Sequence, residues 1–255
     1  MSDSATGDGV KKRDLFFAFL VLVAAWQLLA MAIQKPIVPP PWRVFQVFIS
    51  ELGNGLFAHF LVSLWRVLAS IVLSVLLAAP AGIILGQSRQ LDRLFSPLIY
   101  LLYPIPKVVL VPVVLLILGV GNLAKILIIF MILFFQILVL VRDQASALRP
   151  ELIQSVRSLG AGRRALFRFV YLPASLPAVL TAIRQSVGTS VAVLYVAESF
   201  ATQQGLGYYI SLNGSSLYNY PAMYAGILAM SLLGLGLYFG VDWLEKLLCP
   251  WLRPL

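Results

Sequence analysis

The chain has 255 residues, of which 60% are hydrophobic and only 11% are charged, and its formal net charge is +9. A mean hydropathy of +0.93 is typical of integral membrane proteins and excludes an ordinary soluble enzyme. Membrane topology accounts for the positive charge, so we expect contact with membrane lipid and no nucleic-acid partner.

Six apolar segments are long enough to cross the roughly 30 Å hydrocarbon core as helices. They are Leu15–Ile33, Phe60–Leu85, Leu94–Leu118, Leu123–Val141, Leu176–Val196 and Ala222–Leu244. The sequence has no alternating strand pattern of the barrel type, so helices must satisfy the backbone hydrogen bonds. We therefore predict an all-α integral membrane protein with six transmembrane helices.

The first apolar segment follows three basic residues, as the core of a signal peptide does. Its apolar run of about 19 residues exceeds the roughly 7–15 of such a core, so we expect a retained helix. Most of the 19 lysines and arginines fall on one side if both termini are cytoplasmic. We predict a cytoplasmic tail at 1–13, a transmembrane domain at 14–248 and a cytoplasmic tail at 249–255.

The third span contains four prolines, which cannot all lie within one straight helix. Broken backbone at membrane depth is tolerated where it is buried in protein or lines a wet cavity. The segment Tyr103–Pro112 is therefore a candidate pathway wall or hinge. The alternative is a kink that only fits the neighbouring helices together.

Two basic residues lie at membrane depth, Lys107 in this segment and Arg184 halfway along the fifth span. Such groups usually face the bundle interior or water. They either give a solute pathway a positive field suited to a small anion, or Arg184 pairs with a neighbouring helix. Glu198 lies on roughly the same helix face as Arg184, about 21 Å away. Arg66 either extends its side chain to the membrane interface or pairs with Glu198. The candidate pathway residues are Tyr103, Pro104, Pro106, Lys107, Arg184, Gln185 and Glu198.

A long basic loop, residues 142–173, separates the fourth and fifth spans. Pro150 and Glu151 suit the first turn of a helix, and Gly160 suits a left-handed stop. A second amphipathic stretch, Arg163–Tyr171, follows. We predict two short helices at the inner membrane surface, which either touch anionic lipid or form a docking surface.

The order Gln154-Ser155-Val156-x3-Gly160-x9-Val170-x-Leu172-Pro173 resembles the EAA loop of binding-protein-dependent ABC importer permeases. That pattern is EAA-x3-G-x9-I-x-L-P, so the spacing matches, but the leading Glu-Ala-Ala is replaced. Other segments resemble the permeases of nitrate, taurine and alkanesulfonate importers in the same order. They include Pro39–Val44, Ser63–Val67, Pro80–Gly86, Tyr103–Pro106, Arg157–Ala161 and Gly205–Tyr208.

The resemblance implies a MetI-like bundle in the bacterial inner membrane, with a cytoplasmic coupling helix. It also implies a second permease copy, two ATPase subunits that bind ATP and Mg, and an extracytoplasmic binding protein. The second copy is either identical to the first or a different permease chain, and we expect a homodimer. The coupling residues would be Glu151, Gln154, Ser155, Val156, Arg157, Ser158, Leu159, Gly160, Ala161 and Arg163. The turn at 202–207 would meet the binding protein, with contacts at Gln203, Gln204, Gly205 and Tyr208. Each copy would form half of the pathway for a small solute, an organic or inorganic anion such as nitrate, a sulfonate or taurine.

The sequence has no P-loop, HExxH or GxSxG motif, so we expect no catalytic site and no cofactor in this chain. His59 and Cys249 are the only residues of their types, which argues against a metal site; we expect His59 in an aqueous-side loop. The chief alternative function is a subunit of a secondary transporter or channel driven by an ion gradient, and a membrane-embedded enzyme is a third class.

Overall fold

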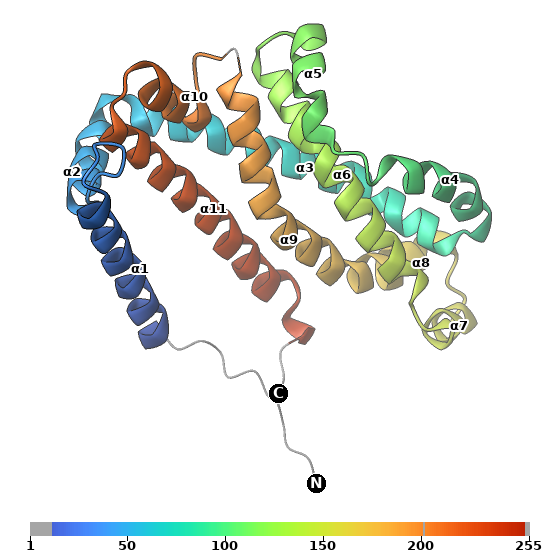
Figure 1. Cartoon of the computed structure of the whole chain (residues 1–255). Helices are drawn as coiled ribbons and strands as arrows, with labels where there is room; N and C mark the ends of the chain where they lie inside the picture. Colours follow the sequence, from blue (N-terminus) through green and yellow to red (C-terminus); the bar gives the residue numbers. More distant parts are fainter. Residues whose placement is uncertain (1–11, 201, 253–255) are drawn as a thin grey trace.

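The computed structural model describes residues 12–200 and 202–252, and all regular structure in these ranges is helical (Figure 1). The prediction of an all-α fold is confirmed. Most of the predicted 1–13 tail and the end of the 249–255 tail lie outside the described residues.

Five long helices are apolar enough to cross a membrane. They are α1 (Lys12–Ile33), α3 (Phe57–Gln87), α6 (Asn122–Ser146), α9 (Leu172–Ser199) and α11 (Tyr220–Leu248). A bent pair of shorter helices is long and apolar enough to cross a membrane only when its two halves are taken together. The first half is α4 (Arg89–Leu102), and the second is η2 (Lys107–Leu110) with α5 (Val111–Leu118). The described chain therefore has five spans, or six when the bent pair is counted as one.

Short helices connect the spans or, in the case of η5, follow the last one. They are α2 (Pro41–Glu51), η1 (Leu52–Leu56), α7 (Pro150–Ser158), α8 (Arg163–Leu166), η3 (Phe167–Tyr171), α10 (Leu206–Ser211), η4 (Leu212–Ser216) and η5 (Pro250–Leu252). The helix α2 lies outside the predicted spans, yet it packs against α11 and buries Val44. Gly205 begins α10, so the expected tight turn at this point continues as a helix.

The core lies between α3, α6 and α9, which pack side by side (Figure 1). α6 is the central helix of this group and buries Ile128, Ile129, Leu133 and Ile137. By contrast, α1 stands apart and contacts the rest through α2 and a stack of Trp26 on Tyr224 at 5.7 Å between ring centroids.

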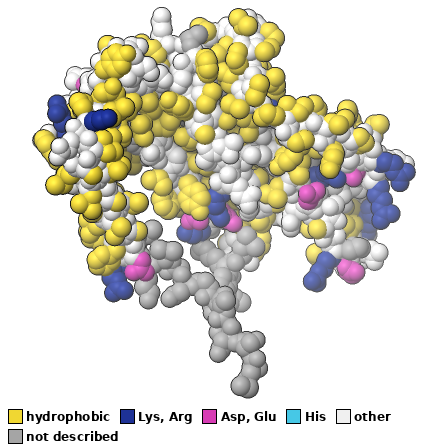
Figure 2. Space-filling view, viewed as in Figure 1, with side chains coloured by type: hydrophobic (Ala, Val, Ile, Leu, Met, Phe, Trp, Pro, Cys, Tyr) yellow, Lys and Arg dark blue, Asp and Glu magenta, His cyan; other side chains and the backbone are white. Residues whose placement is uncertain are grey.

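The outer surface is largely apolar, as a protein surrounded by lipid or by other subunits requires. Figure 2 shows hydrophobic side chains over most of the visible face, whereas many Lys and Arg side chains gather along its lower margin and its right-hand end. The right-hand end includes α7 and the start of α4 (Figure 1). This charge asymmetry has the form that the positive-inside rule describes.

Glycines and serines let α3 approach α6 closely. A Cβ atom at Gly82 would lie 2.9 Å from the Leu138 carbonyl oxygen, and one at Gly86 would lie 2.5 Å from that of Arg142. Ser70 of α3 donates to the Ile126 carbonyl of α6 at 3.0 Å. Small residues and interhelical hydrogen bonds of this kind hold helices together in lipid, where burial against lipid tails gives little driving force.

We expect Gly86→Ala to lower the free energy of unfolding by about 1–3 kcal/mol, because its methyl group meets the backbone of α6. Thermal unfolding of the detergent-solubilised protein measures this loss. Gly236→Ala in α11 is the matched control, since a Cβ there meets nothing within 4 Å. Equal unfolding temperatures for the two variants would show that the α3–α6 contact is not as tight as described.

Candidate functional site

The third span is broken, as its prolines predict. Pro97 lies inside α4, which ends at Leu102, and Pro112 opens α5. The two halves are bent by 73°. Between them, Pro104 and Pro106 remove two backbone N–H donors, so carbonyl groups at the end of α4 lack their helical partners.

Lys107 supplies the missing donors. Its Nζ atom donates to the carbonyl oxygens of Leu102 and Tyr103, each at 2.6 Å, and lies 4.6 Å from the centroid of the Phe135 ring. The side chain is only 9% exposed. Among the described residues, no carboxylate forms an ion pair with it. The break therefore retains a buried positive charge that no carboxylate neutralises among the described residues.

Arg184 is paired with acidic residues of α11. It forms ion pairs with Glu245 and, at 3.5 Å, with Asp242, both near the end of α11. Asp242 also pairs with Lys246 at 2.6 Å. Of the two interpretations of Arg184, the geometry fits the pairing with another helix. Gln185 beside it lines a small cavity together with Tyr103.

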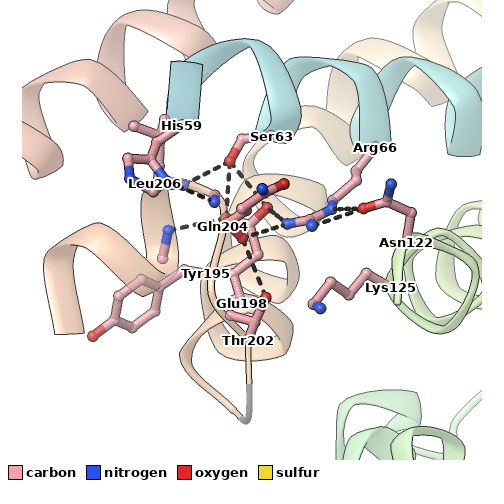
Figure 3. A network of polar contacts seen from close by, with 12 residues as sticks. His59, Ser63, Arg66, Asn122, Lys125, Tyr195, Glu198, Thr202, Gln204 and Leu206 are labelled. Atoms are coloured by element: carbon pink, nitrogen blue, oxygen red, sulfur yellow. Dashed lines mark hydrogen bonds and ion pairs between the residues drawn. The ribbon is translucent and has the colours of Figure 1, made fainter. Parts of the chain in front are cut away.

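Glu198 lies at the centre of a buried polar network (Figure 3). Its Oε1 atom is 2.6 Å from Arg66 Nη1, and its Oε2 atom accepts from Ser63 Oγ at 2.8 Å and from the Gly207 amide at 2.9 Å. Glu198 is 0% exposed and Arg66 is 3% exposed. The pairing of Arg66 with Glu198, one of the two alternatives for Arg66, is confirmed. Glu198 thus fastens the end of α9 to α3.

The guanidinium of Arg66 has partners on every side. Its Nε and Nη2 atoms donate to Asn122 Oδ1 at 2.9 and 2.7 Å, and Nη1 donates to the Gln204 carbonyl at 2.9 Å. Arg66 therefore joins α3 to the start of α6 and to the 202–207 turn (Figure 3). A buried ion pair is tolerated when such additional hydrogen bonds satisfy both groups.

The 202–207 turn is held by its backbone. The Gly205 amide donates to His59 Nδ1 at 3.0 Å, and the Leu206 amide donates to Ser63 Oγ at 2.8 Å. Gly205 has φ +115°, and a Cβ there would collide with the Glu198 carboxylate, so only glycine fits. His59 lies in α3 and is half-buried, which corrects the expectation of a loop position.

The predicted contact residues of this turn differ in exposure. Gln203 and Gln204 are exposed, Gly205 is buried and Tyr208 is half-buried beside the His59 ring. The next residue, Tyr209, donates to Glu51 Oε2 at 3.1 Å. Burial and then the Glu51 carboxylate raise the pKa of Tyr209 above its ordinary value, so the phenol remains a donor that ties α10 to α2.

The long loop forms the first predicted helix, α7. The second predicted stretch is helical, as α8 and the π-helical turn η3, but it is not a separate surface helix because it is continuous with the span α9. Gly160 has φ +84°, as expected for a left-handed stop, and its amide donates to the Arg157 carbonyl at 2.9 Å. Leu166 and Val170 anchor the second part in the core. η3 then runs directly into α9, so α9 continues the loop without a break.

The helix α7 projects from the lower end of the bundle (Figure 1). Glu151, Gln154, Ser155, Arg157, Ser158 and Gly160 are exposed, and Val156 and Ala161 are half-buried. Leu159 is 86% exposed, and Leu152 is also exposed. The side chain of Arg163 lies outside what the structure describes. An apolar and basic helix exposed in this way has the composition of a docking surface.

Comparisons with known proteins agree with this architecture. The profile of the family described as "Binding-protein-dependent transport system inner membrane component" matches residues 76–254. The taurine transport system permease protein TauC of Escherichia coli strain K12 is 28% identical to the chain over 239 residues, 91% of this chain and 86% of TauC. The formylaminopyrimidine transport permease protein ThiX of Halalkalibacterium halodurans is 27% identical, over 91% of this chain and 93% of ThiX.

A solved structure gives the same result for the fold. One chain of the MetNI methionine ABC transporter, in an inward-facing conformation, matches with a TM-score of 0.65 and 20% identity. The match covers 77% of this chain and 97% of that one. The expected MetI-like fold is thus confirmed.

Removing the arginine of the buried network should unfold the bundle more readily. We expect Arg66→Met to cost about 3–5 kcal/mol in unfolding free energy, because Glu198 is left buried without its partner. Thermal unfolding in detergent measures the loss, with Arg43→Met on the exposed side of α2 as the control. If Arg66→Met unfolds at the temperature of the control, the network does not stabilise the fold.

Proposed function

The chain belongs to the family of binding-protein-dependent transport system inner membrane components. We propose that different helices of the chain contact the ATPase, transmit its movement, line the solute pathway and contact the binding protein. As a member of this family, the chain is a multi-pass permease of an ABC importer and holds no ATPase site. This membership sets aside the ion-gradient alternative. ATP and Mg would be bound by partner ATPase subunits.

The exposed helix α7 is the proposed contact with the ATPase, and its exposure is the observation that carries this assignment. Leu152 and Leu159 offer apolar surface, and Arg157 adds a positive charge next to them. The glutamate that begins the motif in related permeases is Gln154 here. Docking would therefore rest on apolar contacts and on Glu151 and Arg157 rather than on a carboxylate at 154.

The ATPase-driven movement would pass from α7 to α9. Leu166 and Val170 fix the second half of the loop in the core, and η3 continues into α9. A force on α7 thus acts on one end of α9. The other end is fastened by Glu198 to α3 and to the 202–207 turn, so it would stay in place while the rest of α9 moves.

We infer that two identical copies form the pathway. The bent pair α4–α5 presents an apolar face, with Tyr100, Leu101, Leu116 and Ile117 all exposed. A second copy would cover part of this face and enclose the break between the helices. Two copies would each bind one ATPase subunit, with the termini on the cytoplasmic side, where the basic residues gather.

The binding protein would approach from the opposite side, at the 202–207 turn. Gln203 and Gln204 are exposed there, and Tyr208 lies half-buried behind them. The turn is rigidly held, because Gly205 and Gly207 donate their amides to His59 and Glu198. A rigid contact loses little conformational entropy on docking.

The proposed solute is a small molecule with an anionic group, either a sulfonate such as taurine or an alkanesulfonate, or an inorganic anion such as nitrate. Two features support this class. TauC, a taurine transport system permease protein, is similar to this chain over most of its length. In addition, the break in the third span holds Lys107 without a carboxylate partner among the described residues, so a solute anion would meet a positive charge.

The coupling role of α7 can be tested by reversing its apolar character. We expect Leu159→Glu to abolish co-purification of the ATPase subunit and to reduce ATP-driven uptake in proteoliposomes at least about tenfold, because a carboxylate replaces an apolar contact. Leu217→Glu is the matched control, since Leu217 is also exposed, at 60%, but lies in the loop before α11. Normal co-purification and uptake for Leu159→Glu would contradict the proposal.

A further inference from the structure

Three cavities meet at Tyr103. A cavity of about 310 Å³ is lined by Lys107 and Gln136, a cavity of about 140 Å³ by Gln136 and Val139, and a cavity of about 670 Å³ by Val139 and Arg142. Tyr103 lines all three. The shared residues place the cavities in a row along α6, from the break in the third span toward the end of α6.

The charges along this row differ in their compensation. Arg142 forms an ion pair with Asp92 of α4 at 2.7 Å. Lys107 donates to the carbonyls of Leu102 and Tyr103 and lies over the Phe135 ring, and no carboxylate pairs with it among the described residues. An ammonium group has three N–H donors, so one donor is not used by these carbonyls, and a bound anion would be its first negatively charged partner. The cavity at Lys107 is therefore the place in the row where an anion is stabilised most.

A second polar group beside the same cavity lacks a partner. Gln136 lines the cavity, and its Oε1 atom is buried and accepts no hydrogen bond within the described residues. A buried acceptor left unsatisfied is costly, so a rotation of this amide toward a ligand that brings a donor gains a hydrogen bond. Thr189 lines the same cavity, and Gln185 lines the next one. The row thus combines Lys107, the positive charge in it that lacks a carboxylate partner among the described residues, with hydroxyl and amide groups.

The cavity is large enough for a small solute. Its volume of about 310 Å³ corresponds to roughly ten water molecules at about 30 Å³ each. A compact sulfonate with a two-carbon chain fits this space with some of its hydration water retained.

We propose that this row is a transit site inside the membrane for a small solute that carries an anionic group and a hydrogen-bond donor, as an amino- or hydroxy-alkanesulfonate does. The anionic group lies at Lys107, and the donor, an ammonium or a hydroxyl group, faces Gln136. Tyr103 borders the solute at each step along the row. The assignment rests on the proposed function, because it takes the chain to be a permease for solutes with an anionic group. It adds Gln136 and Thr189 as recognition residues and leaves Arg184 and Glu198 as structural ones.

Direct binding to the purified transporter tests this site. The permease with its ATPase partner is placed in nanodiscs without binding protein, and radiolabelled taurine is the probe. Ethanesulfonate, which lacks the amino group, and choline, a cation, serve as competitors. We expect saturable taurine binding that ethanesulfonate displaces and choline does not.

Variants assign the two contacts separately. Lys107→Met should weaken the binding of taurine and of ethanesulfonate at least about tenfold. Lys107→Arg should retain most of the binding, because the charge is kept. Gln136→Leu should weaken taurine about tenfold and leave ethanesulfonate unchanged, because only taurine uses the amide oxygen. Lys35→Met, at an exposed lysine between α1 and α2, is the control.

If neither taurine nor ethanesulfonate binds saturably to the wild-type protein, the proposal is overturned, and wild-type affinity in Lys107→Met would overturn it too. If Gln136→Leu weakens the binding of taurine and of ethanesulfonate equally, Gln136 does not recognise the donor of the solute. Co-purification of the ATPase does not involve residues 107 and 136. A wild-type permease that co-purifies with its ATPase but binds neither taurine nor ethanesulfonate therefore refutes the transit site alone. A wild-type permease that does not co-purify with an ATPase refutes the proposed function.

Discussion

The ion pair between Arg66 and Glu198 fixes the geometry on which the rest of the bundle depends. Both groups are removed from solvent, so neither is stable there without the other and without the surrounding hydrogen bonds. Ser63, Asn122 and the Gly207 amide provide these bonds from three parts of the chain. One contact thereby determines where α3, α6 and α9 meet, and it holds the 202–207 turn in a single conformation.

The helix α9 is fixed at its Glu198 end and is connected to η3 and α11 along the rest of its length. Its first turn continues from η3, and Arg184 farther along joins it to the end of α11. Its face toward the broken span lines two of the cavities around Tyr103. A displacement of α7 would therefore change the shape of those cavities while the end of α9 at Glu198 stays in place. This arrangement would join the proposed ATPase contact to the proposed solute pathway through one helix.

Much of this architecture follows from local sequence rules. Apolar length predicts the spans, four prolines predict the broken one, and Gly160 predicts the end of α7. Helices α2 and α10 are not predicted, because each is short and its burial depends on α11 and α3 far away in the chain. The partners of Arg184 are not predicted either, because Asp242 and Glu245 become neighbours only after folding. Gln136 gives no signal in sequence, since its significance comes from a missing partner.

Accessibility of a single cysteine at position 185 tests most directly whether nucleotide-driven movement reaches the cavities. Cys249 is the only natural cysteine and is buried, so Gln185→Cys with Cys249→Ser carries one reactive thiol beside Tyr103. The transporter with its ATPase is assayed in inside-out membrane vesicles with a membrane-impermeant maleimide. We expect rapid labelling without nucleotide and labelling at least several-fold slower when ATP and vanadate trap the closed ATPases. Equal rates in both states would contradict transmission of movement through α9.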